Sequence, residues 1–253
     1  IEDDLQHRDF TINALAVELE SAFTSRGLDN LLIDPCGGRQ DLKSKLISLV
    51  NNKAFDEDPL RILRAFSLAI IFNFKIDKDA LRLIKLKAKD LSRVSYERIR
   101  DELFKILDRP NSFEYLDEMD KLKLLKIIIP EIEIMRGVKQ GPYHHLDVWQ
   151  HSLEASKQLE ILIRELKNNK DVQNYLDEFI STNRRRRALI KLGALLHDIG
   201  KPAALRREDG KTGLRRDLDD DAVDAAGERR AGVPPGRHLR PRRHRRRGPD
   251  PRA

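Results

Sequence analysis

The sequence contains little cysteine, few aromatic residues and no long apolar run. Among its 253 residues is one cysteine, Cys36, which excludes an internal disulfide framework and is typical of a reducing compartment such as the cytoplasm. No apolar run approaches the roughly 20 residues that a membrane-spanning helix needs, and no signal peptide is recognisable. Aromatic residues make up 6%, hydrophobic residues 40% and charged residues 36%. This composition favours a soluble, helix-rich protein and excludes collagen-like, mucin-like and membrane-spanning chains.

The positive charge is distributed unevenly along the chain. The net charge is +7, and residues 203–253 contribute +6 of it, with 14 arginines and 1 lysine against 9 acidic residues. Residues 1–202 are therefore almost neutral. A basic chain often binds nucleic acid, but here the overall charge is weak evidence for such a partner.

The composition changes abruptly after Pro202. Lysine, isoleucine and aromatic residues give way to arginine, aspartate, glycine and proline, which cannot bury enough apolar surface to offset the entropy of ordering. Two interpretations fit this segment: a disordered basic tail that binds RNA, or a sequence artefact such as a shifted reading frame. We favour the artefact and assign the tail no function. Because Ile1 opens what reads as an element already under way, we also expect the chain to be a fragment.

The remaining sequence predicts a mainly α fold. Helical spacing begins at residues 10–20, and short strands are expected at 31–34 and 45–50, on either side of a turn at 35–38. From Pro59 onward helices dominate, and we expect them at 59–72, 77–90, 95–107, 111–126, 146–167, 171–181 and 185–198.

The segment from Phe55 to Ser67 carries the clearest chemical pattern. Pro59 suits the first position of a helix, which predicts Asp58 as its N-cap. Asp58, Arg61 and Arg64 then recur every three residues, so they share one helix face. One interpretation is a capped helix with a surface ion pair. The other is a base-reading edge, because a carboxylate beside a guanidinium can pair with the amino group and ring acceptors of cytosine or adenine, but not with guanine or uracil.

Three further segments, at 4–16, 34–42 and 94–99, accompany this helix. In their order and spacing, the four segments resemble the tRNA nucleotidyltransferase/poly(A) polymerase family, whose CCA-adding members build the 3′ end of tRNA without a nucleic-acid template. The resemblance spans residues 1–202. It implies a fold made of the C-terminal part of an α/β nucleotidyltransferase head, a helical neck and a partial helical HD domain.

The resemblance also implies roles for individual residues. The residues expected to bind nucleotide are Arg8, Asp9, Asn13, Asp58, Arg61 and Arg64, with Asp58 and Arg61 selecting CTP and ATP. The residues expected to order the hinge or support the template helix are Gly37, Gly38, Asp41, Glu57 and Arg98. An ordinary turn would equally explain the two glycines, and a structural salt bridge would explain Arg98. Two positions depart from the family pattern: Ser67 and His7 stand where arginine is common.

The activity implied by the resemblance is transfer of CMP and AMP from CTP and ATP to the 3′ end of tRNA. Such transfer uses Mg²⁺ held by paired carboxylates, which in the family precede the position of Arg8. The sequence shows no such pair, so we expect this chain to select nucleotides but not to add them by itself. The alternatives are a poly(A) polymerase, a metal-dependent HD phosphohydrolase and a non-catalytic RNA-binding protein.

Two later groups of residues suggest further sites. His151 and the adjacent pair His197 and Asp198 resemble the metal ligands of an HD phosphohydrolase domain, which would hold a divalent transition metal, with Lys201 steadying a phosphate. The pattern needs another aspartate, which would fall in the arginine-rich tail. Before the last expected helix stand four arginines that could contact an RNA backbone or form a solvated face: Arg184, Arg185, Arg186 and Arg187.

These assignments divide the chain into four regions. We expect the end of a nucleotidyltransferase head at 1–55, a helical neck with the nucleotide template and RNA-binding region at 56–135, a partial HD domain at 136–202 and the anomalous tail at 203–253.

Overall fold

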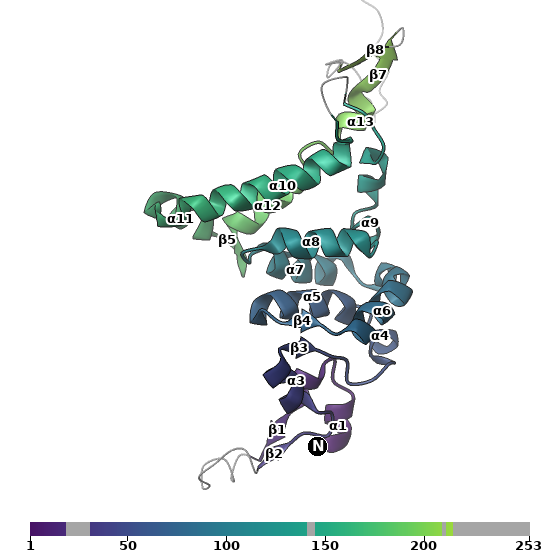
Figure 1. Cartoon of the computed structure of the whole chain (residues 1–253), viewed down its shortest axis with the longest axis vertical. Helices are drawn as coiled ribbons and strands as arrows, with labels where there is room; N and C mark the ends of the chain where they lie inside the picture. Colours follow the sequence, from purple (N-terminus) through teal and green to yellow (C-terminus); the bar gives the residue numbers. More distant parts are fainter. Residues whose placement is uncertain (19–30, 141–144, 209–210, 215–253) are drawn as a thin grey trace, which may run out of the picture. The chain divides into compact units, whose positions relative to one another are not determined.

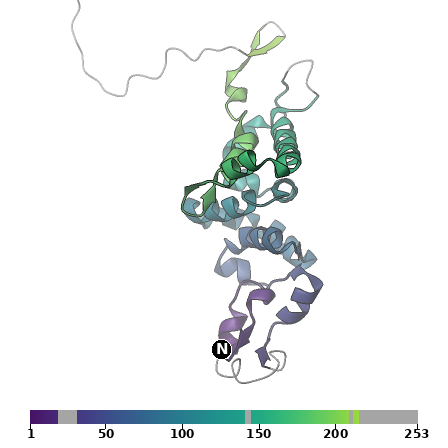
Figure 2. The same cartoon turned by 90° about the vertical axis from the view of Figure 1, so that its left-hand side faces the viewer.

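A computed structural model describes residues 1–18, 31–140, 145–208 and 211–214. These ranges belong to one compact unit, Ile1–Arg216, and they are mainly helical (Figures 1 and 2). Within the arginine-rich segment the backbone forms an antiparallel hairpin of β7 (Leu205–Glu208) and β8 (Lys211–Leu214). The remainder of the expected tail, and the aspartates expected there to complete the HD pattern, lie outside the described residues. No helix in the described part of the chain is long and apolar enough to cross a membrane.

The first region combines short helices with two-stranded pairings. Its elements are α1 (Glu2–Gln6), the 3-10 helix η1 (Thr11–Asn13), β1 (Ala16–Val17), β2 (Leu32–Ile33), α3 (Gly38–Ser44) and β3 (Leu46–Ile47). β1 pairs antiparallel with β2, whereas β3 pairs in parallel with the later strand β4 (Lys75–Ile76). Both expected short strands are therefore present, each shortened to two residues.

The expectation of a helix at residues 10–20 is wrong for residues 10–18, the part of this segment that the structure describes. Phe10 forms an antiparallel bridge with Leu49, and the backbone N–H of Thr11 donates to the carbonyl of Ser48 at 3.0 Å. This segment therefore satisfies backbone groups by pairing with a distant part of the chain. Helical spacing of apolar residues cannot distinguish such a segment from a helix before its partner is known.

The second region is a stack of helices around the main apolar core. Its elements are α4 (Ala54–Glu57), α5 (Arg61–Phe72), α6 (Lys78–Lys87), η3 (Ala88–Arg93), α7 (Tyr96–Leu107), α8 (Ser112–Lys121), α9 (Leu125–Ile128) and η4 (Pro130–Met135). α5 packs against α7, and Leu63 and Phe66 of α5 are completely buried in this core. With this face of α5 in the core, Arg61 and Arg64 lie on the side toward the first region, where they contact His7 and Asp9.

Asp58 makes the N-cap contact that the sequence predicts, although the regular helix α5 begins only at Arg61. It lies between α4 and α5, and Leu60 precedes the first helical residue. Its Oδ1 still accepts a hydrogen bond from the backbone N–H of Leu60 at 3.1 Å. The carboxylate therefore stabilises the turn that joins α4 to α5.

The third region consists of α10 (Val148–Glu165), η5 (Leu166–Asn168), α11 (Lys170–Asp177), β5 (Phe179–Ser181), β6 (Arg184–Arg185), α12 (Arg186–Leu196) and α13 (Lys201–Ala204). α10 begins with a capping box in which Asp147 and Gln150 satisfy each other's backbone N–H groups. α10 and α12 pack along each other (Figure 1). The helix expected at 171–181 ends at Asp177, because the next residues pair as β5 with β6.

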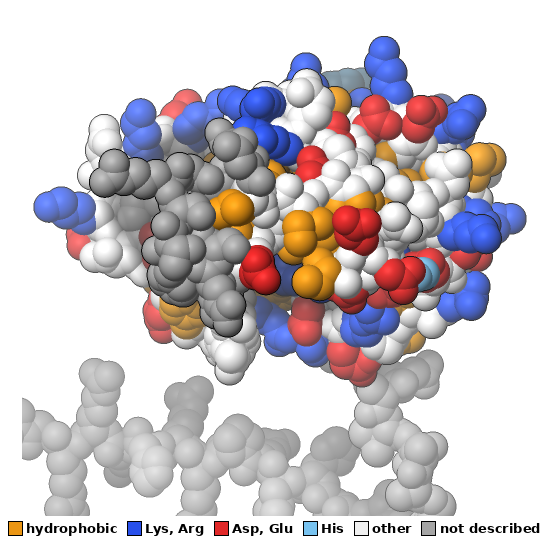
Figure 3. Space-filling view, turned by 90° about the horizontal axis from the view of Figure 1, so that it is seen from below, with side chains coloured by type: hydrophobic (Ala, Val, Ile, Leu, Met, Phe, Trp, Pro, Cys, Tyr) orange, Lys and Arg blue, Asp and Glu red, His pale blue; other side chains and the backbone are white. Residues whose placement is uncertain are grey.

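Charges of both signs are interspersed on the face of the molecule that carries the first region. Figure 3 shows Lys and Arg side chains beside Asp and Glu side chains over this face, around a small group of hydrophobic side chains. This mixing agrees with the nearly neutral balance of residues 1–202. Nucleic-acid or nucleotide recognition there must therefore come from local geometry rather than from a broad positive field.

Candidate functional site

Residues expected to bind nucleotide meet in one cleft. The cleft has a volume of about 650 Å³ and lies between the segment after α1 and the first turns of α5. Its lining consists of His7, Arg8, Asp9, Asn13, Asp58, Leu60, Arg61, Arg64, Leu68 and Arg98. The structure thus brings together all six residues assigned to nucleotide binding, from two segments about fifty residues apart in the sequence.

Asp9 and Arg64 form the central ion pair of this cleft. The Nε of Arg64 donates to Oδ2 of Asp9 at 2.8 Å, and its Nη2 lies 2.6 Å from the same oxygen. The other carboxylate oxygen accepts from the side-chain amide of Asn13 at 3.0 Å and from the backbone N–H of Phe10 at 2.9 Å. Burial alone would raise the pKa of Asp9, but the hydrogen bonds from Asn13 and Arg64 together lower it below its usual value. Asp9 is therefore a fixed anion that orients the arginine.

Asp58 and Arg61 each contact another residue of opposite charge. Oδ2 of Asp58 accepts from Arg98, at the start of α7, at 2.6 Å. Arg61 donates to Oε2 of Glu57 at 2.9 Å and to the backbone carbonyls of Ala54 and His7 at 3.2 and 3.0 Å. Glu57 and Arg98 thus both lie where the resemblance expects supporting residues, one beside each member of the base-reading pair.

These contacts leave hydrogen-bonding capacity on both members of the pair expected to read the base, Asp58 and Arg61. A carboxylate has about four acceptor positions, and the contacts of Asp58 with Leu60 and Arg98 use two. A guanidinium has five N–H groups, and the contacts of Arg61 use three. Both side chains are held in place in the lining of the cleft and retain unused hydrogen-bonding groups.

The turn at Gly37 and Gly38 supports the segment that carries Asp9. Gly37 has a φ of +75°, which favours glycine, and Gly38 begins α3. A Cβ on Gly38 would lie 2.0 Å from the carbonyl oxygen of Thr11. Oδ2 of Asp41 accepts from the hydroxyl of Thr11 at 2.6 Å. The close approach and this hydrogen bond attach α3 to η1, two residues after Asp9, so the turn does more than reverse the chain.

Glu102 is a supporting residue that the sequence analysis missed. It is buried on α7, and its carboxylate accepts from Ser67 and Lys105 at 2.6 Å each, with Arg64 Nη1 at 3.8 Å. Its position four residues after Arg98 places both on one face of α7, which is the signal that could have identified it. Ser67 is buried and serves this network, so its side chain does not face a triphosphate.

Arg8 and His7 are the more exposed members of the cleft. Arg8 forms an ion pair with Asp4 at 2.6 Å, and about half of each side chain or more is exposed. The ring of His7 lies 3.8 Å from the carboxylate of Glu57, while its backbone carbonyl holds Arg61. Arg8 can exchange its exposed partner for a ligand at little cost.

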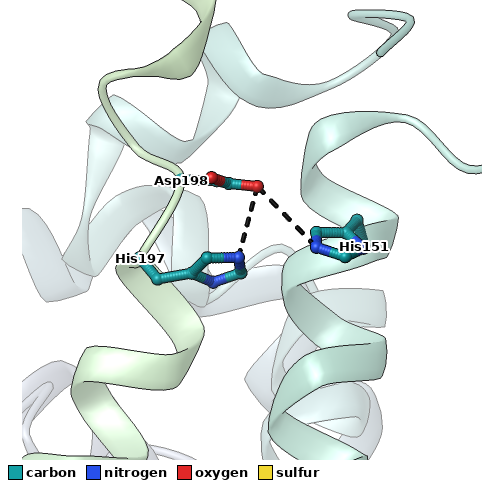
Figure 4. Close-up of side chains that lie close together, drawn as sticks. All are labelled: His151, His197 and Asp198. Atoms are coloured by element: carbon teal, nitrogen blue, oxygen red, sulfur yellow. Dashed lines mark ion pairs between the residues drawn. The ribbon is translucent and has the colours of Figure 1, made fainter. Parts of the chain in front are cut away.

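A second candidate site lies where α12 ends beside the first turn of α10. Figure 4 shows His151, His197 and Asp198 directed toward one another. Oδ2 of Asp198 lies 3.2 Å from Nε2 of His197 and 3.8 Å from Nε2 of His151, and the three ligand atoms lie within 4.8 Å of one another. Metal ligands about 2.1 Å from an ion lie no more than about 4.2 Å apart, so a small side-chain rotation fits them around one.

Lys201 contacts the same carboxylate. Its Nζ lies 3.1 Å from Oδ2 of Asp198 and also donates to the side chain of Gln140. His197 Nδ1 lies 2.9 Å from the carbonyl of Ala194, which fixes the orientation of the ring and directs Nε2 toward Asp198. Two imidazoles and one carboxylate form a donor set that suits a divalent transition metal.

The four consecutive arginines all form ion pairs within the protein. Arg184 pairs with Asp101 at 2.7 Å and Arg185 with Asp108 at 3.4 Å, while Arg186 pairs with Glu178 and Arg187 with Asp177. The guanidinium groups of three of them also lie over aromatic rings, those of Phe104, Phe179 and Tyr175. These contacts join β6 and the start of α12 to neighbouring elements, and contact with an RNA backbone remains a prediction.

Comparison with protein families gives matches in the same order as the expected regions. Residues 1–48 match the poly A polymerase head domain, residues 73–135 match a probable RNA- and SrmB-binding site of polymerase A, and residues 148–228 match the HD domain. The HD match continues past Pro202, where we placed the end of the partial HD domain.

Similar curated proteins are named as tRNA nucleotidyltransferases. The chain is 33% identical over 220 residues to an A-adding tRNA nucleotidyltransferase of Deinococcus radiodurans, with 85% of this chain and 44% of that protein covered. It is 36% identical over 206 residues to a CC-adding tRNA nucleotidyltransferase of Geobacter sulfurreducens, with 80% of this chain and 43% of that protein covered. The chain thus spans less than half the length of these relatives.

Solved structures agree with this comparison. The Thermotoga maritima CCA-adding enzyme complexed with tRNA is 28% identical, with a TM-score of 0.55, over 81% of this chain and 45% of that one. A tRNA nucleotidyltransferase complexed with a primer tRNA and an incoming ATP analogue is 28% identical, with a TM-score of 0.56, over 78% of this chain and 49% of that one. With the head, neck and HD matches in sequence order, the chain belongs to the tRNA nucleotidyltransferase/poly(A) polymerase family.

Proposed function

We propose that this chain forms the nucleotide-selecting part of a CCA-adding tRNA nucleotidyltransferase, which transfers CMP and AMP from CTP and ATP to the 3′ end of tRNA. The observation that carries this proposal is the single cleft that gathers Arg8, Asp9, Asp58, Arg61 and Arg64. The relatives named as A-adding and CC-adding enzymes support CCA addition over the poly(A) alternative.

Base selection follows from the chemistry of Asp58 and Arg61. The free acceptor positions of Asp58 suit the exocyclic amino group of cytosine or adenine, and the remaining N–H groups of Arg61 suit the adjacent ring acceptor. Guanine and uracil place a carbonyl oxygen where that amino group would stand, and two acceptors facing each other repel. The geometry therefore favours CTP and ATP over GTP and UTP.

The other charged residues suit the remaining parts of a nucleotide. Arg8 and Arg64 offer guanidinium groups to phosphate oxygens, with which arginine makes strong, often bidentate contacts. Asp9 offers acceptors to ribose hydroxyl groups, and Asn13 holds its carboxylate in position. The nucleotide would then lie with its base toward the start of α5 and its phosphates toward the arginines.

The transfer step of this family requires divalent metal, and we propose Mg²⁺. The carboxylates of the cleft do not fit a catalytic metal pair, because Asp9 is bound to Arg64 and Asn13, and Asp58 is bound to Arg98. We therefore assign the cleft to nucleotide selection and place the catalytic ions on carboxylates outside it.

Nucleotide binding by the chain tests this proposal. Calorimetric titration should give tighter binding of CTP and ATP than of GTP and UTP, and Asp58→Ala should remove the preference. The matched control is Asp56→Ala, because Asp56 lies two residues away on α4 and pairs with Lys87 rather than with a cleft residue. Equal affinity for all four nucleotides would contradict the proposal.

The same titrations distinguish the alternative functions. Binding of ATP without CTP would favour a poly(A) polymerase, and tRNA binding without any nucleotide preference would favour a non-catalytic RNA-binding protein.

The cluster of His151, His197 and Asp198 supports a second function, metal-dependent phosphohydrolysis. Such a metal would activate water against a phosphate ester when bound, while Lys201 would hold a phosphate oxygen. Added Mn²⁺, Ni²⁺ or Co²⁺ should raise the melting temperature of the protein, and His197→Ala should abolish the rise, whereas His7→Ala should keep it. A rise that persists in His197→Ala would place the metal elsewhere.

A further inference from the structure

A small cavity lies at the far end of the α10 and α12 pair from the histidine cluster. It has a volume of about 180 Å³, and its charged and polar lining consists of Asn111, Glu160, Arg164, Lys167, Arg187 and Lys191, with Gln173 beside them. His151 lies in the first turn of α10, whereas Lys167 follows its last turn. Because α10 has 18 residues and is about 27 Å long, the cavity and the histidine cluster are separate sites.

Two cations of this cavity have no carboxylate partner. Lys191 is paired with Glu160 at 2.6 Å, and Arg187 is paired with Asp177 at 2.7 Å, so these two charges are balanced. In the described part of the chain, Arg164 makes only a 3.4 Å contact with the side-chain oxygen of Asn111, and Lys167 forms no ion pair. The cavity therefore carries two uncompensated positive charges.

Arg187 also carries an unused donor. Its side chain is only 14% exposed, and its Nε–H is buried without a hydrogen-bond partner among the described residues. Its Nη2 already contacts Asp177 and Gln173, which hold the guanidinium in place. A buried N–H group without a partner is unfavourable, so the environment of this guanidinium, whose side chain lines the cavity, is not fully satisfied within the protein.

Lys191 provides a rigid wall for the cavity. Its Nζ donates to the carbonyl of Arg109, the hydroxyl of Ser112 and the carboxylate of Glu160 at 2.6–3.0 Å. These contacts join α8, α10 and α12 at the cavity. The charge of Glu160 is thus neutralised inside the protein and does not oppose an incoming anion.

We propose that this cavity binds a phosphate group. A phosphate dianion would balance Arg164 and Lys167, lie beside the guanidinium of Arg187 and fit the available volume. The apolar part of the lining, from Pro110 and Ile163, would contact whatever group the phosphate esterifies. The same chemistry could come from a small phosphate monoester or from a phosphodiester of an RNA backbone, and the site is independent of the nucleotide cleft.

The Arg187 Nε–H resonance of the full chain, observed by NMR, tests this proposal at the site itself. The resonance is assigned with the variant Arg187→Lys, in which it should be absent. EDTA is present throughout to remove metal ions, so that phosphate cannot bind to a metal held by the histidine cluster. Inorganic phosphate should shift the resonance saturably. The double variant Arg164→Gln/Lys167→Gln should weaken this binding at least tenfold, because it removes two charged contacts with the phosphate. Both side chains are exposed, so the substitutions should not disturb the core. Lys170→Gln, an exposed lysine outside the cavity, should leave the affinity unchanged.

Three further titrations distinguish the sources and the competing outcomes. A shift with adenosine monophosphate, but not with an RNA oligomer that ends in hydroxyl groups, would identify a small phosphate ester, and the reverse would identify an RNA backbone. Acetate should bind more weakly than phosphate, because one negative charge balances only one cation. The proposal is overturned if millimolar phosphate does not move the resonance, if the double variant binds as tightly as the parent, or if acetate binds as well as phosphate.

Discussion

Arg64 on α5 donates a hydrogen bond from Nε to the carboxylate of Asp9 at 2.8 Å, and its Nη2 lies 2.6 Å from the same oxygen, across 55 residues of sequence. This ion pair connects the first region of the protein to α5, the helix that carries Arg61, one of the two residues proposed to read the base. Because Asn13 and the backbone of Phe10 satisfy the other carboxylate oxygen, the pair is a fixed junction rather than a mobile surface contact. The shape of the cleft proposed to bind nucleotide therefore depends on a contact between its two walls.

Asp9→Ala should destabilise the protein by about 2 kcal/mol, because Arg64 and Asn13 lose their partner in a partly buried setting. Arg64 is about one-third exposed, so water offsets part of the loss that a fully buried pair would suffer. Urea unfolding measures the change. Asp4→Ala, which removes the exposed partner of Arg8, is the control and should leave the unfolding midpoint unchanged. Equal effects of the two substitutions would contradict the central role of the pair.

The contribution of Asp9 should depend on pH in a defined direction. The folded state lowers the pKa of Asp9, so its contribution is fully present above the unfolded value of about 3.9 and is lost as pH falls through the lower folded value. The difference in unfolding free energy between the parent and Asp9→Asn should therefore be constant near neutral pH and decrease below about pH 4. A difference that grows on acidification would show that the folded state raises the pKa instead.

Gly38→Ala should destabilise the protein by about 2 kcal/mol or more, because the added Cβ would meet the backbone oxygen of Thr11 rather than a movable side chain. The displaced η1 should also weaken CTP binding, since Asp9 precedes it. Gly193→Ala is the matched control: its Cβ meets no atom within 4 Å in α12, so it should stabilise the protein by about 0.5–1 kcal/mol. Thermal and urea unfolding, together with CTP titration, measure both effects.

Lys191→Met should destabilise the protein by about 3 kcal/mol, because Glu160 would be left as an unpaired buried carboxylate. Adding Glu160→Leu should recover a large part of this loss, since the remaining pair would be apolar and of similar size. The two single variants and the double variant form a cycle that urea unfolding can measure. Additive losses in the double variant would show that the two side chains do not act as a pair.

The periodicity of the sequence was sufficient to locate most helices. The expected helix at 95–107 corresponds to α7 at Tyr96–Leu107, and that at 185–198 corresponds to α12 at Arg186–Leu196. These helices carry an apolar face every three or four residues, and this pattern alone determines which side faces the core. The same spacing placed Asp58, Arg61 and Arg64 on one side of the chain.

Only the tertiary structure decided how these residues pair. Sequence spacing suggests that Asp58 and Arg61 are partners, yet Asp58 is bound to Arg98 and Arg61 to Glu57. It also suggests a helix after Phe10, where the chain instead pairs with Ser48 and Leu49. Local periodicity records which face of a segment is apolar, whereas ion pairs and strand pairings depend on distant segments that folding brings within hydrogen-bond distance. The amino-acid sequence by itself therefore determined the helices and the candidate residues, and the packing of α5 against α7 and the first region determined the site.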